Sequence, residues 1–165
     1  KINDDTERDF ILEADAALAA ELGVEHAPGF VLRGASKGTV RFLGIPAGYE
    51  FATLLEDVVA VSTGRTSLRE ATREALATLE SDVHIRVFVT PSCPYCPGVA
   101  SMAHQMAVES EHVTADVVEV SELPELGSLY SVSGVPKTVV NEDVELLGAQ
   151  PEPSFLAGVL RAARV

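Results

Sequence analysis

The segment Thr90-Pro91-Ser92-Cys93-Pro94-Tyr95-Cys96-Pro97-Gly98 holds both cysteines of the chain, and its flanks indicate the fold. Residues 83–89 before it alternate and are rich in β-branched side chains, which predicts a half-buried strand. Residues 99–108 after it are apolar and rich in Ala and Met, which predicts a helix. The order strand, Cys-x-x-Cys, helix predicts an α/β unit that carries a thiol pair at a helix N-terminus.

This position predicts a role for each thiol. Unpaired N–H groups and the positive end of the helix dipole favour a thiolate over a thiol. Cys93, at the helix N-terminus, is therefore the predicted nucleophile, and Cys96, one turn inside the helix, is the predicted resolving thiol. Pro94 and Pro97 suit the first helical turn, where a missing N–H costs little.

Composition narrows the class of protein. The 165 residues are 47% hydrophobic, enough for one ordinary domain or two small ones. A formal net charge of −13 argues against nucleic acid or an anionic membrane surface as a partner. We find no apolar run long enough to span a membrane and no leader pattern, although the chain begins with Lys1 and is expected to be processed or incomplete. Two cysteines in one tight loop favour a redox or metal role in the cytoplasm over a structural disulfide.

The first half of the chain contains further predicted elements. We expect a solvated loop at 3–7, a short strand at 10–12 and a helix at 14–22 that Gly23 closes. A hairpin of two strands is expected at 29–32 and 39–43. Two helices follow at 50–61 and 67–80, and a Ser67/Glu70 capping box opens the second. The helix 50–61 shows an apolar stripe, formed by Phe51, Leu54, Leu55, Val58 and Val59.

The two halves of the chain repeat one plan. The segment from Leu22 through Pro28 to Leu32 parallels Tyr130 through Pro136 to Val140, and Phe51 parallels Phe155. By the same correspondence, the first half's equivalent of the cysteine-bearing strand lies upstream of Lys1. Without that strand, neighbouring strands would have unpaired backbone groups, so we expect either an omitted segment or another chain to cover the gap, and the apolar stripe to lean on the second half or on a partner.

The motif resembles a known family. Cys93-Pro94-Tyr95-Cys96 is the tetrad of glutaredoxins, and the run 88–97 followed by Met102-Ala103-His104 resembles the second half of two-unit protein disulfide oxidoreductases of thermophilic prokaryotes. The resemblance implies an α/β fold of two tandem thioredoxin-fold units, each a central mixed sheet flanked by helices. Residues 1–64 would be the first unit, incomplete at its N-terminus, and residues 65–165 the complete second unit.

The resemblance also implies a substrate-binding surface. Pro136 would be a cis-proline that faces the cysteines, and Val135 before it would offer backbone groups to a bound substrate strand. The alternative is an ordinary turn proline at a strand start. Pro94 and Tyr95 are assigned to the same surface, although Tyr95 fits simple exposure equally well.

Other candidate residues have plainer interpretations. Glu119 ends a predicted strand and is expected to face solvent more readily than to relay a proton to Cys96. His104 lies about three turns beyond Cys93, too far for acid–base work on its sulfur, and is expected to pack or bond at an interface. Met102 and Met106 are expected in the core. The four histidines lack zinc-ligand spacing, so we expect no metal; a cluster shared between two chains through Cys93 and glutathione stays open.

The sequence therefore predicts an enzyme, a thiol–disulfide oxidoreductase that reduces, oxidises or isomerises protein disulfides through Cys93 and Cys96 without a bound cofactor. Electrons would come from a thioredoxin-reductase-like reductase or from glutathione, and a homodimer is possible. One rival is an electron-transfer domain that serves a peroxiredoxin, or a glutathione-dependent glutaredoxin. A rival of another class is a non-catalytic interaction module with the same fold.

Overall fold

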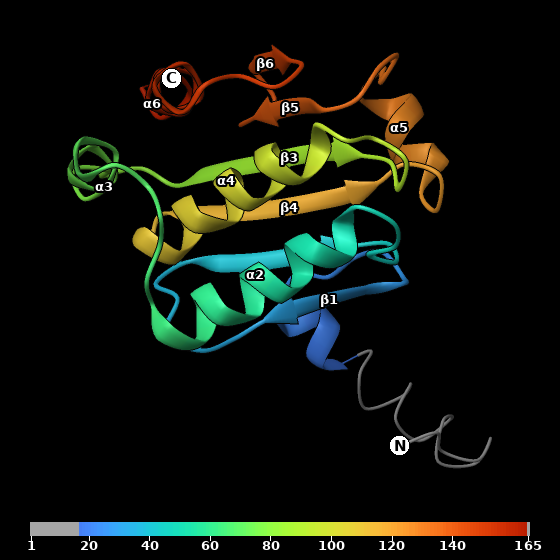
Figure 1. Cartoon of the computed structure of the whole chain (residues 1–165), viewed down its shortest axis with the longest axis horizontal. Helices are drawn as coiled ribbons and strands as arrows, with labels where there is room; N and C mark the ends of the chain where they lie inside the picture. Colours follow the sequence, from blue (N-terminus) through green and yellow to red (C-terminus); the bar gives the residue numbers. More distant parts are fainter. Residues whose placement is uncertain (1–16, 165) are drawn as a thin grey trace.

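A computed structural model describes residues 17–164 and shows one six-stranded mixed sheet with strand order β1-β2-β4-β3-β5-β6. Helices α2 and α4 lie side by side on one face of this sheet (Figure 1). In chain order, the elements are β1 Gly29–Leu32, β2 Thr39–Leu43, α2 Glu50–Thr63, α3 Glu70–Leu76, β3 Val83–Val89, α4 Cys96–Glu109, β4 Val113–Glu119, α5 Pro124–Leu129, β5 Lys137–Val140, β6 Val144–Leu147 and α6 Glu152–Ala162. The mixed α/β sheet flanked by helices confirms the predicted fold class.

Strand β3 forms the centre of the second half. It pairs in parallel with β4 and antiparallel with β5, and its side chains at Ile85, Val87, Phe88 and Val89 are fully buried. Helix α4 makes the crossover between the parallel strands β3 and β4 and covers the face formed by Ile85 and Val87. The cysteine segment therefore begins at the end of a strand whose side chains are fixed in the core.

The hairpin β1–β2 joins this sheet without a break. Residues 39–43 of β2 pair in parallel with 114–118 of β4, while the other side of β2 pairs with β1. Val40 and Phe42 of β2 are buried in the same core as β3 and α4. The backbone of β2 is therefore paired on both sides. The strand expected beside the missing one is β1, which corresponds to β5, and within residues 17–164 β1 pairs only with β2. Strands β1 and β6 are the two edges of the sheet, and cover of the free side of β1 by an omitted segment or another chain stays a prediction.

Two predictions about helices need correction. Ser67 does not cap α3: its N–H and Oγ–H donate to Gln105 Oε1 at 2.6 and 3.0 Å, and α3 runs only from Glu70 to Leu76. The apolar stripe of α2 does not lean on the second half, since Phe51, Leu55, Val58 and Val59 are exposed. The face of α2 that packs inward instead carries Glu50, Thr53, Asp57 and Val61.

Of the remaining predictions for the first half, some fall outside the described residues and one falls largely inside them. The predicted loop at 3–7 and strand at 10–12 lie outside the described residues. The predicted helix 14–22 is helical over its described residues 17–21, and Gly23 follows it with φ of 67°, as a helix-terminating glycine should. No helix among residues 17–164 is long and apolar enough to cross a membrane.

Candidate active site

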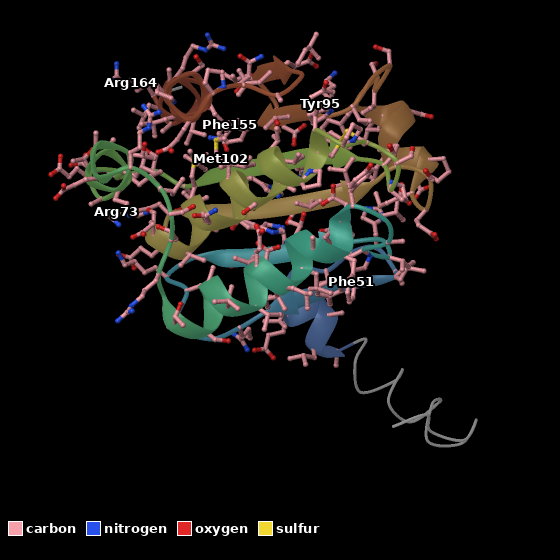
Figure 2. All side chains as sticks on the ribbon, in the orientation of Figure 1. Phe51, Arg73, Tyr95, Met102, Phe155 and Arg164 are labelled. Atoms are coloured by element: carbon pink, nitrogen blue, oxygen red, sulfur yellow. A yellow bond between two sulfur atoms is a disulfide. The ribbon has the colours of Figure 1, made fainter. Side chains whose placement is uncertain are left out.

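The cysteine pair lies where β3 ends and α4 begins. Cys93 and Cys96 are joined by a disulfide with a Cα–Cα distance of 5.5 Å, visible as a yellow bond in Figure 2. Cys96 is 0% exposed and is the first residue of α4, whereas Cys93 is 7% exposed and precedes the helix. Cys93 is therefore the less buried of the two sulfurs, in the direction that the sequence predicts, and its role as the thiol that meets an outside disulfide stays a prediction.

Of the two prolines beside the cysteines, one lies where it was predicted and the other does not. Pro97 sits in the first turn of α4, as expected, because that turn needs no N–H from it. Pro94 instead lies in the turn before the helix and is exposed. Tyr95, also before the helix, is 70% exposed, so its ring is available to a molecule that approaches Cys93.

A cis-proline lies at the end of β3, the strand that leads to the cysteine pair. The Val135–Pro136 bond is cis, as predicted, and so is Ala27–Pro28 at the matching place of the first half. Phe88 pairs with Lys137, which places the buried Pro136 beside Val89 at the end of β3. Val135 packs against the core cluster that includes Cys93 and Cys96, and it makes no backbone hydrogen bond to the described residues.

The first half of the chain also reaches the cysteine segment. The Tyr49 N–H donates to the Pro91 carbonyl at 3.1 Å, so the start of α2 is tied to the turn that holds Cys93. Gly48 makes this approach possible: it has φ of 59°, and a Cβ there would collide with the Pro91 carbonyl oxygen.

From the Tyr49–Pro91 hydrogen bond onward, helices α2 and α4 run parallel to each other. Their middle parts meet where Asp57 Oδ2 lies 2.6 Å from His104 Nδ1. Glu50 precedes Asp57, and Cys96 precedes His104, by about two helical turns, or roughly 10 to 12 Å. This register brings Glu50 to the level of Cys96, and both side chains are fully buried.

His104 is a charged, buried histidine. Its Nδ1 faces the Asp57 carboxylate and its Nε2 donates to the Arg41 carbonyl at 3.0 Å. A carbonyl accepts only, so Nε2 carries a proton, and Nδ1 faces the Asp57 carboxyl group. Burial alone lowers the pKa of His104, but Asp57 and the two hydrogen bonds outweigh it and hold that pKa above its usual value. The predicted interface role of His104 is confirmed.

Glu50 has no such partner. Both of its carboxylate oxygens are buried without a hydrogen bond among the described residues. Loss of water raises the pKa of Glu50 to about 7, against smaller lowering effects of Thr53 and of the His104 charge. A carboxyl group with a pKa near neutrality, at the level of a buried thiol, can accept and return a proton in the physiological pH range.

Glu119 does not match its expected exposure. It is 1% exposed, and its two carboxylate oxygens accept the N–H groups of Ser121 and Glu122 at 3.0 and 2.9 Å. The carboxylate therefore closes the turn after β4 instead of facing solvent, and its lone pairs are engaged by backbone.

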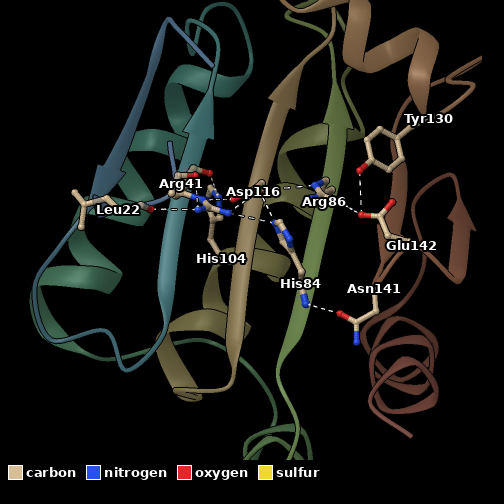
Figure 3. A network of polar contacts seen from close by, with 10 residues as sticks. Leu22, Arg41, His84, Arg86, His104, Asp116, Tyr130, Asn141 and Glu142 are labelled. Atoms are coloured by element: carbon tan, nitrogen blue, oxygen red, sulfur yellow. Dashed lines mark hydrogen bonds and ion pairs between the residues drawn. The ribbon is translucent and has the colours of Figure 1, made fainter. Parts of the chain in front are cut away.

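A second polar network lies on the other face of the sheet (Figure 3). Arg41 donates to both Asp116 oxygens at 2.5 and 3.0 Å, and His84 Nε2 lies 2.5 Å from Asp116 Oδ2. Burial alone would raise the pKa of Asp116, but His84 and Arg41 outweigh it and lower that pKa. Arg41 also donates to the carbonyls of Leu22 and Gly23, so the network joins β2, β4 and β3 to the chain before β1.

Sequence reasoning missed Glu50 and Asp57. Their spacing with Thr53 places all three on one helical face, but the apolar stripe beside it competes for the core, so the pattern favours solvent for the polar face. No group of three or more metal-ligating side chains suited to an ion occurs within residues 17–164.

Comparisons with known proteins agree with this geometry. A thioredoxin-domain family model matches residues 83–161. Thioredoxin of Methanocaldococcus jannaschii is 31% identical over 80 residues, which cover 48% of this chain and 94% of that protein. The structure of a protein disulfide oxidoreductase from Aeropyrum pernix is 35% identical, with a TM-score of 0.84, over 92% of this chain and 66% of that one.

A further likeness involves the alkylhydroperoxide reductase AhpF. The structure of its NTD_N/C domain from Enterococcus faecalis is 25% identical, with a TM-score of 0.79, over 88% of this chain and 70% of that one. The chain spans only 20% of the length of the corresponding protein of Staphylococcus aureus, to which it is 27% identical. The dithiol at the start of α4 and the sequence likeness to a whole thioredoxin together show that the chain belongs to the thioredoxin family of protein disulfide oxidoreductases.

Proposed function

We propose that this chain exchanges electrons with disulfides of protein substrates as a two-unit protein disulfide oxidoreductase, with a first unit, incomplete at its N-terminus, in 1–64 and the redox-active second unit in 65–165. The observation that carries the proposal is the unequal exposure of the two cysteines beside a cis-proline. Cys93 reaches the surface next to Pro94 and Tyr95, whereas Cys96 is sealed behind it.

In the reductive direction, the reduced Cys93 thiolate attacks one sulfur of a substrate disulfide. A mixed disulfide forms, and the other substrate sulfur leaves as a thiolate. Glu50 then takes the proton of the Cys96 thiol, and the resulting thiolate attacks Cys93 Sγ. The second substrate thiolate leaves, so the substrate has gained two electrons and the chain holds the Cys93–Cys96 disulfide. The reverse sequence oxidises a substrate dithiol.

The residue before the cis-proline supports a peptide substrate. The backbone N–H and C=O of Val135 are not bonded to the described residues, so an extended segment that carries the substrate disulfide can pair with them. Pro94 and Tyr95 supply an exposed surface for the neighbouring side chains. We assign the substrate-binding role to these residues and Pro136.

The likeness to AhpF favours a second candidate. A chain that resembles its NTD_N/C domain can also carry electrons between a flavoprotein reductase and a peroxidase. We therefore propose a thioredoxin-reductase-like flavoprotein, or glutathione, as the electron donor, and the cytoplasm as the compartment, because a single Cys-x-x-Cys suits a reducing environment.

Reduction of insulin disulfides by dithiothreitol tests the proposal. The wild-type chain is expected to accelerate precipitation of the insulin B chain, and Cys93→Ser is expected to abolish the acceleration. A wild-type protein that leaves the uncatalysed rate unchanged contradicts the proposal, and adding a purified flavoprotein reductase with NADPH in place of dithiothreitol distinguishes donors.

A further inference from the structure

We propose that the buried Asp57–His104 pair is a positioning element of the redox site, which fixes Glu50 at the level of Cys96 and sets the pH range in which Glu50 takes the Cys96 proton. This inference rests on the proposed exchange reaction and adds to it a pair of residues that regulates the protonation of Glu50. It assigns a function to a charged pair that lies too far from the sulfurs to react with them.

The first argument is the cost of the pair. His104 and Asp57 are both about 2% exposed, and burying two charges costs several kcal/mol per ion before their attraction compensates. Well-packed apolar residues would join α2 to α4 at lower cost. A charged pair at this place therefore provides something that apolar contact does not, namely a fixed register and a fixed local field.

The second argument is the register. The Asp57–His104 contact of 2.6 Å joins α2 to α4, and the Tyr49–Pro91 hydrogen bond of 3.1 Å joins the start of α2 to the turn before α4. Glu50 and Cys96 lie at the N-terminal end of the parallel helices, close to the second tie. His104 is further held by the Arg41 carbonyl of β2, so the helix pair cannot slide along the sheet.

The third argument is electrostatic. The imidazolium of His104 favours the ionised form of Glu50, and the Asp57 carboxylate opposes it. Other charged or titratable groups near Glu50, Asp57 and His104 are Cys93 and Cys96, Glu119 at the end of β4, and Arg41 with Asp116. Arg41 and Asp116 neutralise each other on the far face of the sheet, and Glu119 is held by backbone amides. Loss of the His104 charge alone therefore leaves Asp57 facing Glu50 and makes Glu50 hold its proton more tightly.

Reaction of the reduced full chain with an aromatic disulfide such as 5,5′-dithiobis(2-nitrobenzoate) separates the relevant steps. Attack by Cys93 releases one coloured thiolate, and resolution by Cys96 releases the second. The rate of the second release is measured from pH 5 to 9 for wild type, His104→Gln and Asp57→Asn/His104→Gln. The double variant keeps a polar pair but carries no charge.

We expect His104→Gln to move the pH midpoint of the second release upward by about one unit, which corresponds to one charge at roughly 10 Å in a medium of effective dielectric constant near 20. The neutral double variant should shift it by less than half as much. The matched control is His112→Gln, which removes a histidine paired with Asp82 at the surface at 3.0 Å and should leave the midpoint unchanged.

Repetition in a Glu50→Gln background gives the decisive comparison. If the pair acts through Glu50, His104→Gln no longer moves the midpoint there. An unshifted midpoint in His104→Gln, or a shift that persists without Glu50, overturns the inference. If His104→Gln does not fold, the double variant Asp57→Asn/His104→Gln tests the inference. In that variant both charges are absent, so a midpoint displaced by a full pH unit or more contradicts the argument that the two charges set the protonation of Glu50. Failure of the proposed function looks different, since wild type would then release no second thiolate at any pH, which overturns both proposals.

Discussion

Glu50 combines two opposing properties. It is fully buried and both its oxygens lack hydrogen-bond partners among the described residues, so its ionised form is costly. The same burial brings its pKa to about 7, where a carboxyl group can pass a proton to and from a thiol. The burial that makes ionised Glu50 costly at high pH is therefore also what gives its carboxyl group the pKa that the proposed proton transfer with Cys96 needs.

Glu50→Gln should stabilise the protein at alkaline pH. The folded-state pKa of Glu50, about 7, exceeds its ordinary value of 4.5, so the folded protein holds a proton that the unfolded chain has released between these values. Stability of wild type then falls from about pH 4.5 to about pH 7 by roughly 3 kcal/mol, and the loss persists above pH 7. Thermal melts should show the variant ahead of wild type at pH 8 and level with it at pH 4. Equal melting temperatures at pH 8 would falsify this.

Exchange of the two cysteines for serine should have unequal consequences. Cys96→Ser keeps the accessible nucleophile and loses the resolving thiol, so it should accumulate mixed disulfides with substrate proteins, whereas Cys93→Ser should not. Non-reducing gels with reduced-and-alkylated controls measure the adducts. Adducts confined to the Cys93 variant would mean that the two roles are reversed.

Reduced Cys93 should also react with iodoacetamide well before Cys96. The reason is access together with the helix N-terminus just beyond it, which favours the thiolate. Alkylation of Cys96→Ser followed against pH should show a midpoint below the value of about 8.5 for a free thiol. A midpoint at or above that value would remove the argument from the helix terminus.

At the scale of elements, the start of α2 is the part of the first half on which the site depends. Its approach to the cysteine turn needs a residue with positive φ and no Cβ, which is Gly48. A larger residue would push α2 away from Pro91 and with it displace Glu50 from the level of Cys96.

Gly48→Ala should therefore lower stability by at least about 1 kcal/mol, from backbone strain alone, and slow the resolution step. Denaturant unfolding and the second thiolate release measure the two effects. Gly98→Ala on α4 is the matched control, because a Cβ there meets nothing within 4 Å; it should be neutral or slightly stabilising. Parallel behaviour of the two variants would show that the Gly48 contact does not position α2.

At the scale of the molecule, the two halves of the chain differ in how far they bury the corresponding helical residues. Phe155 of α6 is fully buried, whereas the corresponding Phe51 of α2 is 56% exposed. The exposed stripe of α2 and the edge strand β1 lie together at the end of the sheet farthest from α6 (Figure 1). Contact of this surface with further protein, including a second copy of the chain, stays a prediction.

Separate expression of the halves tests the division into units. Residues 67–165 keep the strands from β3 to β6 and their helices, so this fragment should unfold cooperatively and retain some insulin reduction. It lacks Glu50, so resolution by Cys96 should lose its midpoint near pH 7. Residues 1–61 keep only the β1–β2 hairpin and α2 among the described strands and long helices, too little for independent stability. A cooperative melt of that first fragment at low concentration contradicts the proposed division.

The sequence by itself determined the order of elements, the hairpins with their prolines, and the position of the cysteine pair between a strand and a helix, because these depend on local spacing and on residue types close together in the chain. It did not determine which side of α2 packs inward. Helical periodicity shows only which residues share a face, and the apolar stripe looked like the buried one. Tertiary packing placed Glu50 and Asp57 inside instead, because the β2–β4 pairing sets α2 beside α4, where His104 and Cys96 lie. Contacts between residues so far apart in the chain have no local signature, and the carboxyl group proposed to serve Cys96 became visible only in the folded chain.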